Sequence, residues 1–181
     1  MLALALLIVA LPAFAEEEPW ALLRQGGHVV LIRHTITTPG VGDPEGFRLE
    51  DCSTQRNLSE EGKQHAKRIG QAFREFRVPI EALYSSPWCR CVETAGLAFG
   101  PGAEIWHALS NLFGRPENRQ KQIDELSARI GGYKGKGNLV LVTHGSTVLA
   151  LARVSLQTGD MVILAPKGEG RFAVAARLNV R

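Results

Sequence analysis

The sequence predicts an α/β fold, a three-layer sandwich in which helices cover both faces of a mostly parallel central sheet. Residues 29–32 and 139–142 are continuously apolar, which is typical of strands buried on both faces of a parallel sheet. Segments with helical periodicity alternate with the short predicted strands along the chain. Such alternation favours parallel strands joined by crossover helices.

The first fifteen residues predict an export signal. They are almost wholly apolar and end in the small-x-small pattern of Ala13 and Ala15, although no Lys or Arg precedes the apolar part. The stretch is too short to span a bilayer, which takes about 20 apolar residues. A buried N-terminal helix is the alternative, but three glutamates and Pro19 are expected to break it. We therefore expect residues 1–15 to be a signal peptide, residues 16–181 to form the mature domain, and the protein to be periplasmic or secreted, without stable membrane insertion after cleavage.

Composition favours one ordinary domain. The chain has 181 residues, and 45% of them are hydrophobic, which is ample for a single core. The formal net charge is only +3, and Lys and Arg are scattered among Asp and Glu. Since the basic stripe of a nucleic-acid binder is missing, we expect no nucleic-acid partner. The oligomeric state has no signature in the sequence.

The middle of the chain supplies the helices and the remaining strands. Ser59 is a suitable N-cap, with two glutamates in the first turn that follows it, and apolar residues at helical spacing continue from there until Pro79. The other predicted elements are a strand at 80–84, a helix with Pro87 in its first position, a strand at 103–108, a helix at 117–130, and a hairpin of 161–164 and 172–176.

Charged side chains follow the predicted strands where each one ends. Arg33 and His34 follow the first strand, and His144 follows the strand at 139–142, with Gly145 and a helix-capping Ser146 next to it. A glycine turn before a helix favours anion binding. Because parallel strands bind ligands at their carboxyl ends, we expect these side chains to converge at one edge of the sheet.

Arg90 is expected at the same edge, in the first turns of the helix after residues 80–84. A cation is unusual there, because the helix N-terminus is already the positive end of the dipole. A solvated arginine is the simpler interpretation, but the neighbouring cations favour an anion close by.

Two arginines and two histidines at one sheet edge favour phosphoryl transfer. Guanidinium groups offer forked donors that match phosphate oxygens. One imidazole can attack phosphorus, and a second can hold the equatorial oxygens. No Asp/Glu cluster of the kind that holds magnesium accompanies them, so we expect neither a metal nor a cofactor, and a small phosphorylated substrate as the partner.

Three segments together resemble the histidine phosphatase superfamily, which has the phosphoglycerate-mutase-like fold. These are Leu31-Ile32-Arg33-His34, Ser85-Ser86-Pro87 through Arg90 to Thr94-Ala95, and Val142-Thr143-His144-Gly145. The resemblance covers nearly the whole predicted mature chain in the correct order. It implies that His34 is the phosphorylated nucleophile, that His144 is the second catalytic histidine, and that Arg33, Arg90 and His144 form the phosphate pocket.

The stretches Asp51-Cys52 to Gly62 and Trp88-Cys89-Arg90-Cys91 also resemble a bacterial subgroup that is often exported. One neighbouring group acts on phosphate of the lipopolysaccharide core, so the resemblance makes an envelope phosphate one conceivable substrate.

Two positions depart from the family pattern around the nucleophile. Thr35 stands where the family usually has Gly, and its hydroxyl is a potential donor to a phosphate oxygen. The asparagine of mutase-type members is replaced around Gly40, within a Gly- and Pro-rich loop at 37–50 that is suited to folding over a site.

The proton donor of the family has no clear counterpart. The family commonly uses a Glu in the middle segment, where this chain reads Ala108-Leu109-Ser110-Asn111, or an acid after the second histidine. Glu117, Asp43 and Asp51 are the candidate donors. A weak or absent donor costs about 10²–10⁴ in rate for poor leaving groups and matters less when the leaving group needs no proton.

The odd number of cysteines leaves one thiol unpaired within the chain. Export permits a disulfide, and we expect Cys52 to pair with Cys89. Geometry disfavours a bridge between Cys89 and Cys91, which lie within one tight segment. Zinc is set aside because neither Cys-x-x-Cys nor His-x-x-x-His spacing occurs.

The sequence therefore predicts a metal-independent phosphomonoesterase that forms a phosphohistidine and acts on a small phosphorylated metabolite or an envelope phosphate. A phosphatase is favoured over a mutase because the chain is short and lacks long inserts. Two alternatives stay open: a phosphate-ligand binding protein that has lost turnover, and a phosphoprotein or phosphohistidine phosphatase.

Overall fold

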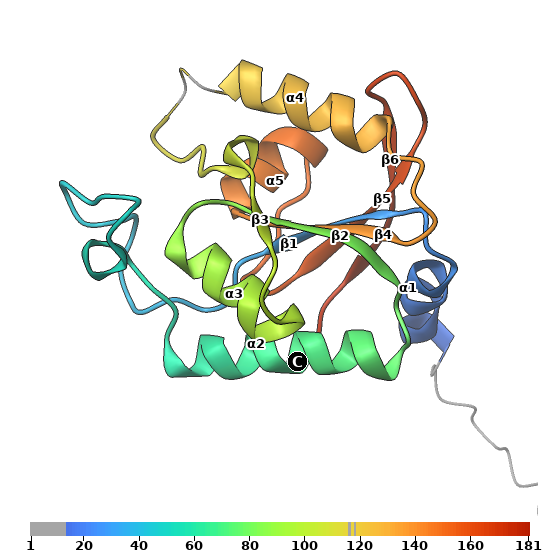
Figure 1. Ribbon diagram of the computed structural model, residues 1–181, viewed down its shortest axis with the longest axis horizontal. Coiled ribbons are helices and arrows are strands. Elements are labelled where there is room, and N and C mark those ends of the chain that lie inside the picture. The colour runs from blue at the N-terminus through green and yellow to red at the C-terminus, as the bar shows by residue number, and fades with distance from the viewer. Residues whose placement is uncertain (1–13, 116, 118) are drawn as a thin grey trace, which may run out of the picture.

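A six-stranded sheet separates two layers of helices in the computed structural model, which describes residues 14–115, 117 and 119–181 (Figure 1). The strand order is β3-β2-β4-β1-β5-β6. The strands are β1 (Val29–Arg33), β2 (Ile80–Ser85), β3 (Glu104–Ile105), β4 (Asn138–Thr143), β5 (Met161–Pro166) and β6 (Phe172–Leu178). The helices are α1 (Phe14–Gln25), α2 (Glu60–Glu75), α3 (Cys89–Phe99), α4 (Arg119–Gly131) and α5 (Gly145–Ala152), with short 3₁₀ turns η1 (Cys52–Thr54) and η2 (His107–Leu109). The predicted three-layer α/β fold is confirmed.

Strand direction explains where the site lies. The four strands β3, β2, β4 and β1 run parallel to one another. Strand β5 pairs antiparallel with both β1 and β6, and β5 and β6 form the predicted hairpin. Between β1 and β4 the register pairs Val29 with Leu139 and continues to Arg33 opposite Thr143. The two strands therefore end level with each other.

The uninterrupted apolar runs reflect burial on both faces. In β1, Val30 and Ile32 pack toward α1, α2 and α3, while Val29 and Leu31 pack toward α4 and α5. All four side chains are fully buried. Figure 1 shows α2 and α3 on one side of the sheet and α4 and α5 on the other.

The N-terminal segment differs from the sequence prediction in where its helix ends. Helix α1 begins at Phe14 and continues through the three glutamates and Pro19, so the predicted helix break was wrong. Proline removes only one helical hydrogen bond. The turn beyond it is anchored by Trp20, which is buried and stacks on Phe76 with 4.4 Å between the ring centroids. Most of the predicted signal lies outside the described residues, so it stays a prediction. No helix within the described ranges has the length and apolar character needed to cross a membrane.

Two other boundaries shift for identifiable reasons. Helix α3 begins at Cys89 with Trp88 as N-cap, not with Pro87 in its first position, because Ser86 N–H still bonds to the carbonyl of Val142 at 2.9 Å, in the manner of the sheet. The predicted strand at 103–108 is reduced to Glu104–Ile105, since η2 turns the chain away from the sheet.

Helices α2 and α3 approach each other at a glycine. Ser59 caps α2 as predicted, and its Oγ accepts from the N–H of Gly62 at 3.1 Å. Further along α2, a Cβ at Gly70 would lie only 1.8 Å from the carbonyl oxygen of Ala98 in α3. The close crossing therefore requires a residue without a side chain at position 70.

We expect Gly70→Ala to lower the free energy of unfolding by about 1–3 kcal/mol, because the methyl group would force the two helices apart. Gly96→Ala is the matched control: Gly96 lies within α3, with open space around its Cβ position. There alanine should stabilise the helix by about 0.5–1 kcal/mol. Urea unfolding measures both, and equal effects of the two variants would contradict the close crossing.

Candidate active site

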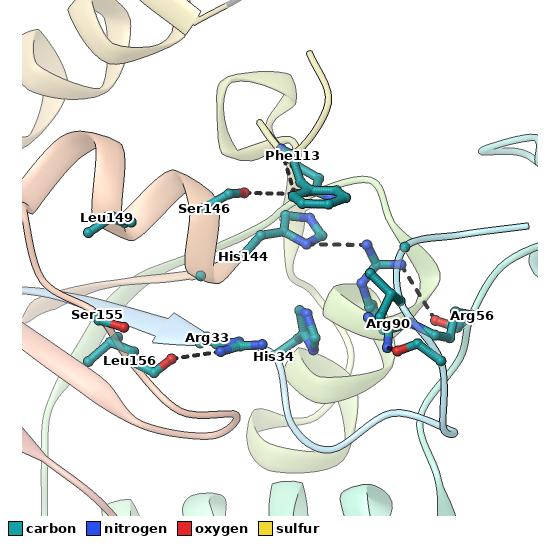
Figure 2. A pocket seen from close by; sticks show the side chains of 15 residues that line it. Arg33, His34, Arg56, Arg90, Phe113, His144, Ser146, Leu149, Ser155 and Leu156 are labelled. Atoms are coloured by element: carbon teal, nitrogen blue, oxygen red, sulfur yellow. Dashed lines mark hydrogen bonds between the residues drawn. The ribbon is translucent and has the colours of Figure 1, made fainter. Parts of the chain in front are cut away.

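The carboxyl ends of β1 and β4 open into a cavity of about 460 Å³ (Figure 2). The structure brings all four predicted residues, Arg33, His34, Arg90 and His144, to its lining. The other lining residues are Gly40, Val41, Gly42, Arg56, Asn111, Phe113, Gly145, Ser146, Leu149, Ser155 and Leu156. The predicted convergence at one sheet edge is confirmed.

His34 is held in one orientation by backbone groups. Its N–H donates to the carbonyl of Thr143 at 2.9 Å, and its ring Nδ1 lies 2.9 Å from the carbonyl oxygen of Thr35. A carbonyl accepts only from a protonated nitrogen, so Nδ1 carries the hydrogen and Nε2 keeps its lone pair. Burial, reinforced by the charges of Arg90 and Arg33, lowers the pKa of His34 to about 3. The ring is therefore neutral, and the lone pair of Nε2 is available.

His144 faces His34 across the cavity, with 5.4 Å between the ring centroids. Its Nε2 lies 2.8 Å from Ser86 Oγ, and its Nδ1 lies 3.5 Å from Nη2 of Arg90. Burial, followed by the neighbouring His34 and Arg90, holds the pKa of His144 well below its usual value. Because the Ser86 hydroxyl both donates and accepts, it is compatible with either tautomer. The Arg90 guanidinium can only donate, so Nδ1 of His144 is the acceptor and Nε2 carries the hydrogen toward Ser86 Oγ.

Arg33 lies against the start of α5. Its Nη1 donates to the carbonyl of Leu156 at 2.7 Å. A Cβ at Gly145 would lie 3.2 Å from the guanidinium group, so the glycine after His144 lets the planar cation approach the backbone of the helix. The sequence signal at Gly145 therefore has a steric cause.

Arg90 forms a buried ion pair with Asp43. Nη1 and Nη2 lie 2.6 and 3.2 Å from the two carboxylate oxygens, and the side chains are only 2% and 4% exposed. Asp43 also accepts from Trp88 Nε1 at 3.0 Å and from Arg56 N at 3.1 Å. Burial by itself raises the pKa of Asp43, but the hydrogen bonds and charge of Arg90 outweigh it and keep the pKa below its usual value. Asp43 is an ionised anchor that ties its loop to Arg90.

Arg56 is a lining residue that the sequence reasoning missed. Its Nη1 donates to the carbonyl of Gly40, and it completes a set of three guanidinium groups around the cavity. The residue lies between η1 and the cap of α2 and follows no strand, so a search for polar strand ends does not select it. Its position shortly after the Gly- and Pro-rich loop at 37–50 was the only available signal.

The three arginines share one unusual feature. Nε of Arg33, Arg56 and Arg90 is buried and has no hydrogen-bond partner among the described residues. Buried donors are rarely left unpaired, and the three guanidinium groups that line one cavity favour an oxyanion as its ligand.

The other two candidate proton donors lie away from the cavity. Asp51 is paired with Arg48 and with Ser53 N and Oγ, and neither it nor Glu117 is among the described residues that line the cavity. No carboxylate is found among those lining residues. The described site therefore offers basic and neutral groups to a leaving group.

Two further residues have roles different from those predicted. The buried Thr35 hydroxyl lies 3.3 Å from Thr94 Oγ1 and does not line the cavity. Ser146 does not cap α5, whose N-cap is His144. Instead its Oγ donates to Asn111 Oδ1 at 2.7 Å and accepts from the N–H of Leu112 at 3.2 Å, which fastens the segment after η2 to α5.

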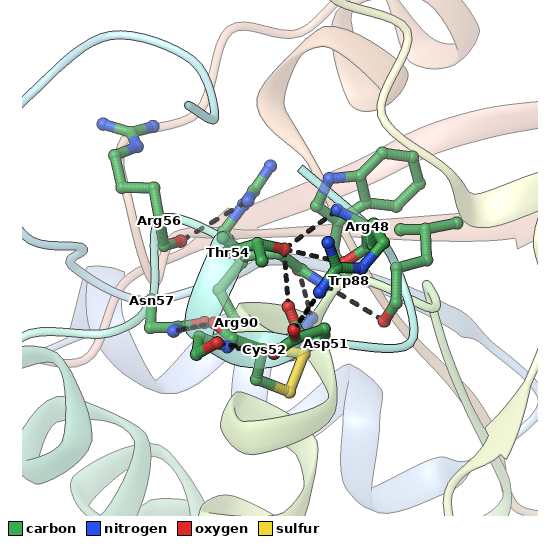
Figure 3. Close-up of a disulfide and its surroundings, with 12 residues drawn as sticks. Arg48, Asp51, Cys52, Thr54, Arg56, Asn57, Trp88 and Arg90 are labelled. Atoms are coloured by element: carbon green, nitrogen blue, oxygen red, sulfur yellow. Dashed lines mark hydrogen bonds and ion pairs between the residues drawn. A yellow bond between two sulfur atoms is a disulfide. The ribbon is translucent and has the colours of Figure 1, made fainter. Parts of the chain in front are cut away.

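The predicted disulfide between Cys52 and Cys89 is present and joins η1 to the first residue of α3 (Figure 3). Gln55 Oε1 accepts from the N–H of Cys89 at 3.0 Å and reinforces the same connection. Arg90 follows directly along α3, so the link holds the loop segment with Arg56 beside it. Cys91 is the free, buried thiol, and burial raises its pKa to about 12.

The two low histidine pKa values predict an acid-sensitive fold. Above about pH 6.5 the His34 ring is neutral in both the folded and the unfolded chain, and it contributes no pH dependence. Below that pH the His34 ring binds a proton in the unfolded chain, whereas in the folded chain it stays unprotonated down to about pH 3. The free energy of unfolding therefore falls as the pH is lowered. We expect the free energy of unfolding to fall by about 2 kcal/mol less in His34→Gln than in the wild type between pH 7 and pH 5. Urea titrations at the two pH values measure the difference, and equal losses in both proteins would contradict a neutral His34.

Comparisons with known proteins agree with this geometry. The family model of the histidine phosphatase superfamily (branch 1) matches residues 29–129. No curated protein sequence matches the chain.

Solved structures share the fold at low sequence identity. A protein histidine phosphatase SixA in complex with tungstate has a TM-score of 0.60 and 13% identity, over 84% of this chain and 96% of that one. A phosphoserine phosphatase from Entamoeba histolytica in complex with 3-phosphoglyceric acid has a TM-score of 0.59 and 14% identity, over 85% and 98%. A putative phosphohistidine phosphatase SixA from Agrobacterium tumefaciens has a TM-score of 0.57 and 20% identity, over 84% and 97%. Because the family model spans more than half of the chain, the protein belongs to branch 1 of the histidine phosphatase superfamily.

Proposed function

We propose that this histidine phosphatase is a metal-independent phosphomonoesterase that acts on a small phosphorylated substrate through a phosphohistidine at His34. The observation that carries the proposal is the neutral His34 ring in one cavity with three guanidinium groups. A phosphate dianion bound by these cations lies beside Nε2 of His34.

The reaction needs two displacements. Nε2 of His34 attacks phosphorus, an N–P bond forms, and the bond from phosphorus to the leaving oxygen breaks with its electron pair on the leaving group. Water then attacks phosphorus, an O–P bond forms, and the N–P bond breaks with its electron pair on Nε2, which releases inorganic phosphate and restores the imidazole. The Thr35 carbonyl, which accepts from Nδ1–H, stabilises the positive charge that the ring carries while it is phosphorylated.

The other residues stabilise the transferring group. Arg33, Arg56 and Arg90 neutralise the negative charge on the equatorial oxygens, and His144 holds the transferring group from the opposite side. Asp43 fixes the position of the Arg90 guanidinium through its Nη atoms.

A phosphohistidine phosphatase is the second candidate, and one observation favours it. Since the described lining residues include no carboxylate, the enzyme is best suited to leaving groups that depart without a proton from the protein. A phosphorylated imidazole leaves as a neutral ring once its other nitrogen is protonated. The similar SixA structure is named as a protein histidine phosphatase.

We expect hydrolysis of 4-nitrophenyl phosphate to persist in excess EDTA and to fall at least about 10³-fold in His34→Ala. His28→Ala is the control, because His28 precedes the same strand at its opposite end and should retain activity. Chelator-sensitive hydrolysis contradicts the metal-independent route. Turnover absent from the wild type, with vanadate still bound, supports a phosphate-binding protein instead. Measured with the same proteins, a strong preference for phosphoimidazole over alkyl phosphates favours the second candidate.

Export is also part of the proposal, and it places the substrate among envelope or periplasmic phosphates. The apolar residues 1–15 and the disulfide support it, because disulfides persist in oxidising compartments. When the full chain is expressed, we expect the protein to be recovered from the periplasm with Glu16 as its first residue. Cell fractionation with N-terminal sequencing tests this, and an intact N-terminus in the cytosol contradicts it.

A further inference from the structure

The rim of the cavity carries apolar side chains that no protein contact covers. Val41, Phe113 and Leu149 are 89%, 63% and 52% exposed, and all three line the cavity. Seven large apolar side chains are exposed in the described part of the chain, so nearly half of them are gathered at this one opening. Exposed apolar side chains are ordinary when scattered, but a group at one site indicates a binding surface.

The rim residues come from three segments that are fixed to the phosphate-binding residues. Phe113 N–H donates to Asn111 Oδ1 at 3.1 Å, and the same oxygen accepts from Ser146 on α5. Leu149 follows Ser146 by three residues along α5 and thus lies on the same helix face. Figure 2 shows Phe113, Ser146 and Leu149 along one edge of the cavity.

Val41 is fixed from the other side. Its neighbour Gly40 accepts from Arg56, and Asp43 two residues later is paired with Arg90. The rim is therefore positioned by the same contacts that position the guanidinium groups.

We infer that the rim is the subsite for the leaving group, and that the substrate is a phosphomonoester whose organic part is apolar. The inference rests on the proposed function and specifies its substrate class. The cationic floor binds the phosphate, while Val41, Phe113 and Leu149 enclose a hydrocarbon or aromatic group and remove it from water. A sugar or nucleotide would place hydroxyl or charged groups beside these side chains, which offer no hydrogen-bond partner and gain nothing from the contact.

A neighbouring cavity offers the main competing location for the organic part. It measures about 290 Å³, shares Asn111 with the first cavity, and is lined by the cations Arg115 and Lys121 and the single carboxylate Glu125 among others. Arg115 lies over the rings of Phe47 and Trp88 at 5.4 and 5.3 Å. An organic part that extended there would carry a second anionic group.

A series of 4-alkylphenyl phosphates separates the two locations, because the alkyl chain adds apolar area while the phenol keeps nearly the same leaving-group pKa. We expect kcat/KM to rise roughly twofold per methylene over the first few carbons, about half the effect of full burial. Phenyl phosphate with a carboxylate on the ring should gain nothing. A flat series, or a gain from the carboxylate, overturns the inference.

The variants Phe113→Ser and Leu149→Ser should flatten the dependence on chain length, measured relative to each variant's own rate on phenyl phosphate. Val174→Ser is the matched control, since Val174 is a 43% exposed apolar residue on β6 outside the cavity lining. It should keep the wild-type slope. Rim variants that also keep that slope overturn the inference.

The inference and the proposed function fail in distinguishable ways. Calorimetry of 4-alkylphenyl phosphonates, which cannot be hydrolysed, measures affinity without turnover. Affinity that rises with chain length in a protein without phosphatase activity supports the subsite and overturns the enzyme. Phosphatase activity with affinity independent of chain length supports the enzyme and overturns the subsite.

Discussion

The parallel register between β1 and β4 is the constraint on which the site depends. With Arg33 opposite Thr143, the next residue of each chain segment is a histidine, and the N–H of His34 bonds to the Thr143 carbonyl. A slip of one residue would move every side chain of β1 into the opposite core. Since both cores are closely packed, they fix the register, and the register brings the two imidazoles within 5.4 Å.

The residues described around the cavity carry an excess of positive charge, which favours an anion as the ligand. Burial and mutual repulsion lower the pKa values of Arg33 and Arg56, and the same cations help keep His34 neutral. Asp43 compensates only part of this charge, because its two oxygens occupy the Nη atoms of Arg90. Burial is the main reason that His34 stays unprotonated, and the fixed cations that reinforce this effect also attract a dianion to the cavity.

Sequence reasoning was successful where chemistry follows a buried strand. Arg33 and His144 stand at strand ends, and apolar runs locate such ends well. Arg56 and the Asp43–Arg90 pair depend on how a long loop returns to the sheet edge, and periodicity carries no information about that path. The role of Ser146 was also predicted wrongly. Serine is a common helix N-cap, but the Ser146 hydroxyl donates to Asn111 instead. The helix through Pro19 formed because tertiary packing of Trp20 outweighed local propensity.

The floor and the rim of the cavity impose compatible demands on a leaving group. Without a carboxylate among the described lining residues, an alkoxide would have to leave unprotonated, which is slow. An aromatic oxygen leaves more easily because its negative charge spreads over the ring, and an aromatic ring also packs favourably against apolar side chains such as Phe113 and Leu149. The proposed subsite would thus select leaving groups that need no proton from the described floor. The lack of a carboxylate among the described lining residues and the exposed apolar rim both support this one proposal, a preference for apolar leaving groups that depart as stable anions.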